Sequence, residues 1–303
     1  ALGAGWVNCR NAHWCCGMPL SVEGLWAVAK LQAQLARWLN PSSSRAVGTL
    51  PKPWPPAEAI ASAAVTPRAD QPLQQPAISI VIPALNEATN LPSVLNAIYA
   101  AASVEVVVVD GGSSDGTAQV ARAMGARVVE SAPGRSHQMN QGARAAKGPL
   151  LIFLHADTRL PKGFDQAIRQ TLAQPGVVAG AFTLAIDSPR RGLRWVEWGV
   201  NLRSRYLHMP YGDQAIFLKA EVFHQLGGFP DLPMMEDFEL VRRLRKLGKV
   251  AIAPAAVVTS DRRWRSLGVL RTTLANQVMV ISYLLGVDPH RLARWYRHLG
   301  KPR

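Results

Sequence analysis

A run of four valines followed by an acidic, glycine-rich turn constrains the fold of this chain more than any other feature. The segment reads VVVVDGGSSDGT over residues 106–117. Consecutive β-branched residues indicate a strand that is buried on both faces, and the glycines and threonine after it indicate a turn into a helix. Because ligands of open α/β sheets bind at the carboxyl ends of the strands, Asp110 and Asp115 are predicted to lie in a ligand site.

The same order of strand, polar turn and helix repeats from residue 77 onward, which predicts a largely parallel sheet with helices on both faces. The pattern loosens after residue 176, although two further strands and a helix are expected there. The predicted strands are residues 78–82, 105–109, 127–130, 150–154, 177–186 and 214–218. The predicted helices are residues 90–101, 117–124, 136–146, 162–173 and 236–247.

Composition divides the chain into three parts. Residues 1–76 are interpreted as an extension, largely disordered, with one helix over 19–40 and a linker rich in Pro and Ala. Residues 77–265 are predicted to form the α/β domain, and residues 266–303 a basic helical part. All three cysteines precede residue 17 and lack zinc-site spacing. A domain without cysteine fits a cytoplasmic protein.

Positive charge is concentrated in the C-terminal part of the chain. The net charge is +14, and the segment from residue 241 to the end contains only two acidic residues, Asp261 and Asp288. Such a surface suits a membrane, nucleic acid or phosphorylated ligands. The longest apolar run, residues 278–287, is shorter than the ~18 residues that cross a bilayer, so it indicates a buried or interfacial helix.

Polar side chains also follow the first and fourth predicted strands. Asn86 and Glu87 come after the first strand, where they either cap a helix or contact a ligand. His155 and Asp157 follow the fourth strand, two residues apart, and in an extended segment both side chains point to one side. An imidazole and a carboxylate so placed can hold Mg²⁺ or Mn²⁺ against a diphosphate.

Charged residues open two segments of the C-terminal half. Glu236 and Asp237 begin a helix that ends in arginines, which suits either the helix dipole or a general base at the helix mouth. Arg263 and Trp264 either bind phosphate or belong to a basic surface.

With these motifs in this order, the chain resembles the family 2 glycosyltransferases of the GT-A fold from about Ala77 to about His290. The resemblance rests on IVIPALNE at residues 80–87, on the turn at residues 109–117 and on the Glu236–Asp237 pair. Three narrower blocks, at residues 134–143, 153–158 and 211–214, resemble one bacterial subgroup. That subgroup is often labelled an arsenosugar-biosynthesis or radical-SAM-associated glycosyltransferase.

The resemblance implies a role for each matching residue. Asp237, with Glu236 as the substitute, would be the base, and Asp157 would hold the metal with help from His155, which stands where the broader family has Asp. The donor, a UDP- or GDP-sugar, and the diphosphate would contact Pro83, Asn86, Glu87, Asp110, Asp115, Arg135, Gln138, Asp157, Arg263 and Trp264. The acceptor side would comprise Tyr211, Gly212, Asp213 and Gln214.

The resemblance therefore implies an inverting transferase that uses Mg²⁺ or Mn²⁺ and acts on an unknown acceptor hydroxyl. Two alternatives stay open: a nucleotidyltransferase on a similar sheet, and a membrane-associated binding protein with a degenerate site. No nucleic-acid partner is expected. The helical stripe Leu270, Leu274, Val278, Ile281 and Leu285 packs either on the domain or on an anionic membrane surface, which would place the protein at the inner face of the cytoplasmic membrane.

Overall fold

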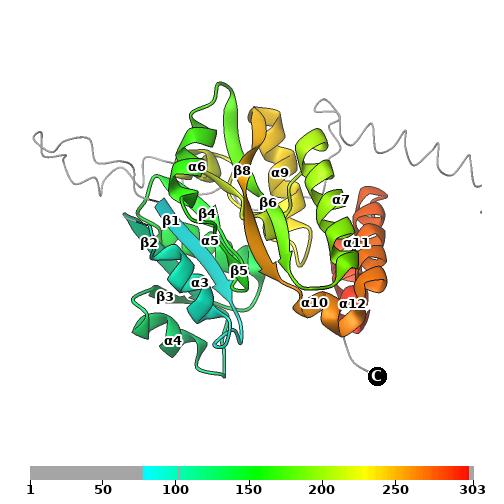
Figure 1. Ribbon diagram of the computed structural model, residues 1–303, viewed down its shortest axis with the longest axis horizontal. Helices are drawn as coiled ribbons and strands as arrows, with labels where there is room; N and C mark the ends of the chain where they lie inside the picture. The colour runs from blue at the N-terminus through cyan, green and yellow to red at the C-terminus, as the bar shows by residue number, and fades with distance from the viewer. Residues whose placement is uncertain (1–77, 102, 300–303) are drawn as a thin grey trace, which may run out of the picture. The chain divides into compact units, whose positions relative to one another are not determined.

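The computed structural model describes residues 78–101 and 103–299, which form an α/β body with a mixed central sheet (Figure 1). The extension, helix and linker expected before residue 77 lie outside the described residues, as do the cysteines. The described strands are β1 (Ile78–Ala84), β2 (Val104–Asp110), β3 (Arg127–Glu130), β4 (Leu150–Phe153), β5 (Thr158–Arg159), β6 (Val177–Asp187), β7 (Phe217–Lys219) and β8 (Lys249–Ser260).

These strands form one eight-stranded sheet in the order β3-β2-β1-β4-β7-β6-β8-β5. The β3-β2-β1-β4 half is parallel throughout, as the alternation of strands and helices predicts. Strand β7 is antiparallel to both of its neighbours, β4 and β6. The fold is therefore of the α/β class, with a parallel half joined to a mixed half through a short reversed strand.

Strand register brings the polar turns to one edge of the sheet. Ala84, the last residue of β1, lies opposite Asp110, the last residue of β2. Strand β4 ends at Phe153 opposite Val81, so the polar residues that follow it emerge at the same edge. The carboxyl ends of three parallel strands thus supply the first side chains of a ligand site.

Helices cover both faces of the sheet. On one face, the side chains of Ile80, Ile82 and Val108 share a buried core with helices α3, α4, α6 and α7. On the other face α5 packs so closely that a Cβ atom at Gly142 would lie 2.3 Å from Val81 Cγ1. The described helices are α3 (Leu91–Ile98), α4 (Thr117–Ala123), α5 (Arg135–Ala145), α6 (Phe164–Leu172), α7 (Arg191–Leu207), η1 (Gly212–Gln214), α8 (Ala220–Gln225), α9 (Glu236–Leu247), α10 (Arg262–Leu267), α11 (Val269–Leu284) and α12 (Pro289–Leu299).

Two parts of the mixed half differ from the sequence-based expectation. The strand expected over 214–218 begins at Phe217, because Gln214 closes the 3₁₀ turn η1 and Ala215 takes a positive φ of 49°. Helix α7 and strand β8 were not predicted. Strand β8 is long and pairs in parallel with β6, but its alanines and Pro254 conceal the β pattern.

Helices α10, α11 and α12 follow β8 and stand beside α7 (Figure 1). They cover the chain segment that was expected to be basic and helical. None of the helices within residues 78–299 is long and apolar enough to cross a membrane.

Candidate active site

Asp110 ends β2 as a buried carboxylate with only one oxygen satisfied. Its Oδ2 atom accepts hydrogen bonds from the backbone N–H groups of Gly112 (3.3 Å) and Ser113 (3.1 Å). Its Oδ1 atom is buried and has no hydrogen-bond partner among the described residues. A buried polar atom without a hydrogen-bond partner costs free energy. Asp110 Oδ1 is therefore available to accept a hydrogen bond from an N–H or O–H group of a ligand.

The turns after β1 and β2 are bound to each other by short-range polar contacts. Asn86 Oδ1 accepts from the backbone N–H of Ser114 (2.9 Å), and the Asn86 N–H donates to Ser113 Oγ (2.9 Å). Asp115 accepts from the Ala88 N–H (3.0 Å) and from Thr117, and the Thr117 hydroxyl lowers the pKa of that carboxyl. Asp115 therefore stabilises the turn and the start of α4.

Gln138 links the ends of β1 and β2 by hydrogen bonds from its side chain. Its buried Nε2 atom donates to the carbonyl oxygens of Ala84 (2.9 Å) and Val109 (2.8 Å). A Cβ atom at Gly111 would lie 2.9 Å from that same nitrogen, so the glycine turn is needed for the close approach. Gln138 therefore positions the two turns. Pro83, also predicted at the site, lies in β1 opposite Val109 and has no polar side-chain group.

Arg262, the first residue of α10, joins two carboxylates from different strand ends. Its guanidinium donates to Glu87 Oε1 (2.6 Å) and Oε2 (3.1 Å), and lies 3.5 Å from Asp157 Oδ2. Burial raises the pKa of Asp157, and the Arg262 charge opposes that rise. The place between Glu87 and Asp157 therefore accommodates a cation.

His155 and Asp157 face different groups, because the segment that carries them turns. The Thr158 N–H donates to the His155 carbonyl oxygen (3.1 Å), so the extended geometry assumed from the sequence is wrong. Asp157 faces Arg262, whereas His155 Nε2 lies 3.4 Å from Arg135 Nη1. Burial, and then the Arg135 charge, lowers the pKa of His155 to about 3, which leaves the imidazole neutral at physiological pH.

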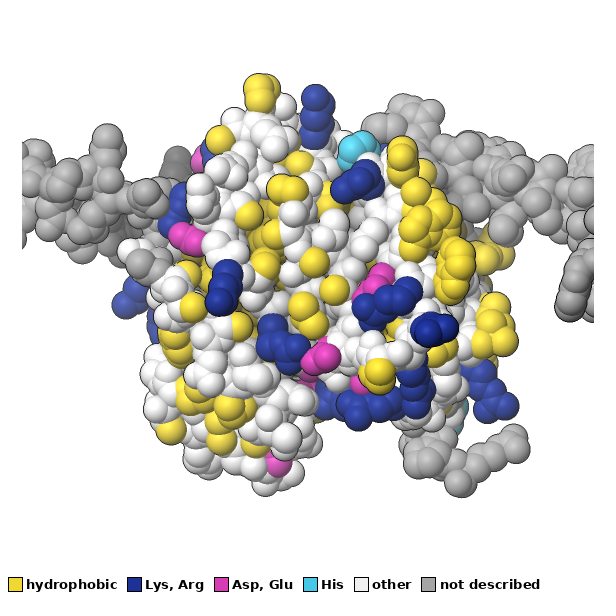
Figure 2. All heavy atoms as spheres, in the orientation of Figure 1, with side chains coloured by type: hydrophobic (Ala, Val, Ile, Leu, Met, Phe, Trp, Pro, Cys, Tyr) yellow, Lys and Arg dark blue, Asp and Glu magenta, His cyan; other side chains and the backbone are white. Residues whose placement is uncertain are grey.

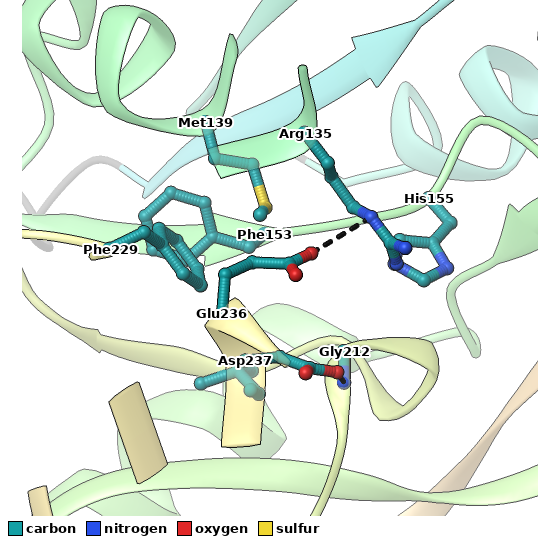
Figure 3. Close-up of a pocket in the computed structure, with 9 residues that line it drawn as sticks. Arg135, Met139, Phe153, His155, Gly212, Phe229, Glu236 and Asp237 are labelled. Carbon is teal, nitrogen blue, oxygen red and sulfur yellow. Dashed lines mark hydrogen bonds and ion pairs between the residues drawn. The ribbon is translucent and has the colours of Figure 1, made fainter. Parts of the chain in front are cut away.

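Arg135 begins α5 and lies between His155 and a buried carboxylate from α9 (Figure 3). Arg135 Nε is 2.9 Å from Glu236 Oε1, and the Glu236 side chain is only 2% exposed. Burial raises the pKa of Glu236, while Glu236 in turn raises the pKa of Arg135. Glu236 is thus engaged in an ion pair, and Asp237 is the freer of the two acids that open α9.

Asp237 is held at the mouth of α9 by backbone donors. Its Oδ2 atom accepts from the Gly212 N–H at 2.7 Å. A Cβ atom at Gly212 would lie 3.1 Å from Asp237 Oδ2 and 3.2 Å from His155 Nε2, so the glycine lets these two side chains approach each other. Asp237, Gly212, His155 and Arg135 line one pocket with Phe153, Phe229, Met139 and Ile216 (Figure 3).

The segment around η1 is anchored by α7. Gln214 is fully buried and donates to the Phe182 carbonyl oxygen (2.9 Å), while its Oε1 accepts from Ser204 Oγ (2.6 Å). The guanidinium of Arg203 lies 3.5 Å from the centre of the Tyr211 ring. Gln214 thus supports the turn from inside, and Gly212 is the residue of this turn that lines the pocket.

Asp213, like Asp110, has a buried carboxylate oxygen without a hydrogen-bond partner among the described residues. Its Oδ1 atom is buried and makes no hydrogen bond within the described part of the chain. Burial raises the pKa of Asp213, and the nearby Arg203 charge partly opposes the rise.

Of the neighbouring arginines that open α10, Arg262 bonds the carboxylates at the strand ends, whereas Arg263 acts on His155 and Asp157 through its charge. The Arg263 guanidinium lies 5.1 Å from the centre of the Tyr296 ring, and Trp264 is a core residue. Sequence reasoning also missed Arg203. Adjacent helical residues point about 100° apart, so the sequence alone does not show which of the two arginines bonds the strand-end carboxylates.

A divalent metal fits the Asp157 side of the site better than the His155 side. No cluster of three or more His, Cys, Asp or Glu side chains placed to hold a metal occurs among residues 78–101 and 103–299. Mg²⁺ in sites of this kind needs one or two carboxylates because substrate phosphates complete its coordination. Asp157 and Glu87 would supply those oxygens, and a metal would take the place between them that the Arg262 guanidinium holds.

Comparison with known proteins identifies the domain. The model of the family described as Glycosyl transferase family 2 matches residues 79–229. This range contains the turns after β1, β2 and β4 and the η1 segment, and it ends before α9. The chain therefore carries a family 2 glycosyltransferase domain, as the sequence motifs predict.

Curated relatives match over a limited stretch. The uncharacterized glycosyltransferase Mb0553 of Mycobacterium bovis is 41% identical over 88 residues, which are 29% of this chain and 39% of that protein. The glycosyltransferase AglE of Haloferax volcanii is 34% identical over 93 residues, 27% of this chain and 31% of its own length. The chain thus spans well under half the length of these relatives.

Solved structures share the fold at low identity. The mannosyltransferase PcManGT of Pyrobaculum calidifontis, in complex with GDP-Man and Mn²⁺, has a TM-score of 0.51 and 22% identity over 90% of this chain and 76% of its own. TarS 1-349 of S. aureus, in complex with UDP, has a TM-score of 0.51 and 15% identity over 70% of this chain and 66% of its own. The fold is the GT-A fold that the sequence predicts.

Proposed function

We propose that this chain, which carries a family 2 glycosyltransferase domain, transfers a sugar from a nucleotide-diphosphate donor to an acceptor hydroxyl with inversion at the anomeric carbon. One observation carries the proposal: Asp110 and Asp157 lie at one edge of the sheet, Asp237 approaches the neighbouring His155 from the start of α9, and the three carboxylates have different environments. Asp110 is buried with an open acceptor, Asp157 faces a cation, and Asp237 accepts backbone hydrogen bonds at a helix mouth.

Asp110 is assigned to the nucleoside. A ribose hydroxyl or a base N–H would donate to Oδ1, the atom that has no partner within the described residues. The backbone N–H groups on Oδ2 hold the carboxylate in place. The nucleoside-containing ligands UDP and GDP-Man in the TarS and PcManGT structures support the choice of donor class.

Asp157, with Glu87 beside it, is assigned to the divalent metal that accompanies the diphosphate. When bound, Mg²⁺ or Mn²⁺ offsets the negative charge that the departing diphosphate acquires. Arg262 and Arg135 place two further positive charges at the strand ends. The Mn²⁺ in the mannosyltransferase complex supports this assignment.

Asp237 is assigned as the general base. Its Oδ2 would take the proton of the acceptor hydroxyl as the oxygen bonds to the anomeric carbon and the bond from that carbon to the diphosphate oxygen breaks. Attack from the face opposite the leaving group inverts the centre in one displacement, so no covalent intermediate on the protein is required. The Gly212 N–H keeps the carboxylate aimed at the pocket.

Two finer assignments also stay predictions from the sequence: the arsenosugar-associated subgroup and the cytoplasmic location. The acceptor-side segment, Tyr211 and Asp213 above all, is the place where acceptor specificity would be determined. Nucleotidyl transfer is the competing chemistry on such a sheet, and it differs in using a nucleoside triphosphate and releasing pyrophosphate.

A thermal-unfolding panel with UDP, GDP, UTP and GTP, each with Mn²⁺, with Mg²⁺ and with chelator, tests the proposal. A ligand at 100 times its Kd stabilises the folded state by about 2.7 kcal/mol. We expect a shift with UDP or GDP that needs the metal, and its loss in Asp157→Asn. Glu130→Gln, at the exposed end of β3, is the control.

Absence of any nucleotide-diphosphate shift in every metal condition would contradict the proposal. Stabilisation by triphosphates alone, with pyrophosphate released on turnover, would favour the nucleotidyltransferase instead.

A further inference from the structure

The inner side of α7 carries polar side chains beside the apolar residues Leu193, Val196 and Val200, which pack on the core. Asn201 bonds both the N–H (2.8 Å) and the carbonyl oxygen (3.0 Å) of Leu184 in β6. Glu197 accepts from the Ile186 N–H farther along the same strand. These side chains pair backbone groups of β6 that β7 does not reach, since β7 pairs only with Ala179 and Gly180. The inner side of α7 is therefore used to satisfy a strand edge.

The outer side of α7 is apolar and aromatic. Trp195 is 74% exposed and Trp198 60% exposed, and their rings contact each other edge to face with centroids 6.2 Å apart. Leu202 and Tyr206 continue the same stripe at helical spacing and are also exposed. Figure 2 shows hydrophobic side chains gathered along this helix. Single exposed apolar residues are ordinary, but a row with two tryptophans is not.

Helix α11, which contacts α7, carries a second exposed stripe. Leu270 is 72% exposed, and Leu274, Val278 and Leu285 are each about half exposed. The opposite side of α11 supplies the buried residues Thr272, Met279 and Tyr283. The sequence left open whether the stripe that includes Leu270 and Leu274 packs on the α/β domain or on a membrane surface. In the structure this stripe does not pack on the α/β domain.

The charges around this two-helix face are mainly positive, although Asp261 pairs with Arg265 at the start of α10 and Asp288 lies between α11 and α12. Helices α7, α10, α11 and α12 contain a single acidic residue, Glu197, which is engaged with β6 and with Arg194. Exposed arginines lie on these same four helices, and Figure 2 shows Lys and Arg side chains close to the hydrophobic ones on this part of the surface. These arginines include Arg191, Arg205, Arg265, Arg271, Arg291, Arg294 and Arg297.

We propose that the face formed by the apolar rows of α7 and α11 docks on an anionic lipid surface. Tryptophan, tyrosine and leucine on one side of a helix, bordered by arginines, is the pattern of helices that lie in the membrane interface. Anionic headgroups attract each nearby arginine, and apolar burial adds to that attraction. A second copy of the chain fits less well, because it would present the same positive charge to this face.

This inference is independent of the proposed transfer reaction, since none of the face residues is assigned to the donor or the acceptor. Docking of this face would orient the candidate active site relative to the membrane. Helix α7 also supplies Arg203 to Tyr211 and Ser204 to Gln214, so a bilayer beneath α7 would fix the direction in which the acceptor-side segment points.

Vesicle flotation of the full chain tests the docking. We expect binding to vesicles of phosphatidylglycerol and phosphatidylcholine, weaker binding at high salt, and little binding to phosphatidylcholine alone. The double variant Trp195→Ser/Trp198→Ser should reduce partitioning by roughly tenfold or more, and Leu270→Ser/Leu274→Ser should act in the same direction. Leu247→Ser, on α9 and 53% exposed, is the matched control and should bind like the parent.

No binding to anionic vesicles at low salt would overturn the proposal. Equal binding by the parent and the tryptophan variant would also overturn it, because charge alone would then account for the attraction. If the parent is a dimer on sizing and the tryptophan variant a monomer, the occupant of the face is a second copy and the lipid assignment is wrong. Circular dichroism and thermal unfolding of each variant confirm that α7 remains folded.

Discussion

The donor side and the acceptor side of the candidate site compensate their charges in different ways. On the donor side, Asp110 and Asp115 accept mainly from backbone N–H groups of their own and adjacent turns. On the acceptor side, Arg135 pairs with Glu236 from a distant helix, and Asp237 accepts from Gly212 of η1. The Asp110 turn of the donor side is therefore held by contacts within and between neighbouring turns, whereas the Glu87–Asp157 part, where Arg262 pairs with both carboxylates, and the acceptor side depend on tertiary packing.

This difference predicts different responses to mutation. A carboxylate held by its own turn keeps its surroundings when it is neutralised, so its loss should affect ligand binding and little else. A buried charge held by a remote partner leaves that partner uncompensated, which costs stability as well as function. The predictions below test this contrast, from the largest expected effect to the smallest.

Neutralising Asp237 should have the largest effect, and it should fall on turnover. With a general base removed, Asp237→Asn is expected to lower kcat by roughly 10²–10⁴-fold while the donor affinity stays close to the parent value. Steady-state kinetics and calorimetric titration of the nucleotide separate the two quantities. Asp231→Asn, on an exposed loop residue, is the control. A parallel fall in donor affinity would assign Asp237 to binding instead.

The two partners of the Arg135–Glu236 pair should differ in their cost to folding. Arg135→Met leaves a carboxylate that is 2% exposed without its partner, whereas Glu236→Gln leaves an arginine that is 45% exposed and can be hydrated. We expect a loss of about 3 kcal/mol for the first variant and about 1 kcal/mol for the second, measured by urea unfolding.

The exposed pair Arg122–Glu130 supplies matched controls for that asymmetry. Arg122→Met and Glu130→Gln disrupt a pair whose side chains are both more than half exposed, so each should cost no more than about 0.5 kcal/mol. Similar costs for Arg135→Met and Glu236→Gln would contradict the view that burial of Glu236 dominates the pair.

Local motifs explain why the donor side was predictable from the sequence. Four valines, a glycine turn and a threonine specify where β2 ends and α4 begins, and Asp110 lies between them as expected. The parallel register that aligns β1 with β2 follows from the alternation of strands and helices. The carboxyl-edge position of Asn86, Glu87 and Asp110 thus needed no information from remote residues.

The acceptor side, together with the Glu87–Asp157 part of the donor side, required contacts between distant segments that a single sequence does not reveal. Arg135 and Glu236 were each predicted as site residues from the family resemblance, but only the fold shows that they pair with each other. The turn after β4 directs His155 and Asp157 to different groups. The sequence-based prediction assumed an extended segment, in which both side chains would point to one side. Arg262 reaches the site only because α10 begins there after β8, a strand that its sequence conceals.

Neutralising Asp110 should weaken nucleotide binding without destabilising the fold. A charged acceptor for a ligand hydrogen bond contributes about 1.5–3 kcal/mol, so Asp110→Asn is expected to lower the affinity for UDP or GDP by roughly ten- to a hundredfold. Asp115→Asn is the matched comparison from the same turn, and its carboxylate is already occupied by Ala88 and Thr117. Titration calorimetry should show near-parental affinity for Asp115→Asn; equal losses in the two variants would mean that the turn, and not the open oxygen, binds the nucleotide.

The smallest expected effect is a gain of stability at Asp213. Burial raises the pKa of this carboxyl, so the folded protein holds the proton over a pH range in which the unfolded chain has released it. Stability therefore falls as pH rises through that range, and at neutral pH the full cost of the buried charge is present. Asp213→Asn should increase the free energy of unfolding at pH 7 by about 1 kcal/mol, and the gain should disappear near pH 4, the ordinary range of a carboxyl.

Urea unfolding of Asp213→Asn at both pH values tests that expectation, with Asp187→Asn as the control, since Asp187 is largely exposed beside Arg159. An equal gain at both pH values would mean that the effect comes from packing and not from charge. A loss at neutral pH would mean that Arg203 more than compensates the buried carboxylate. A gain confined to neutral pH, together with reduced turnover, would mean that the acceptor side retains a destabilising charge next to Tyr211 and Asp237 because the reaction needs it.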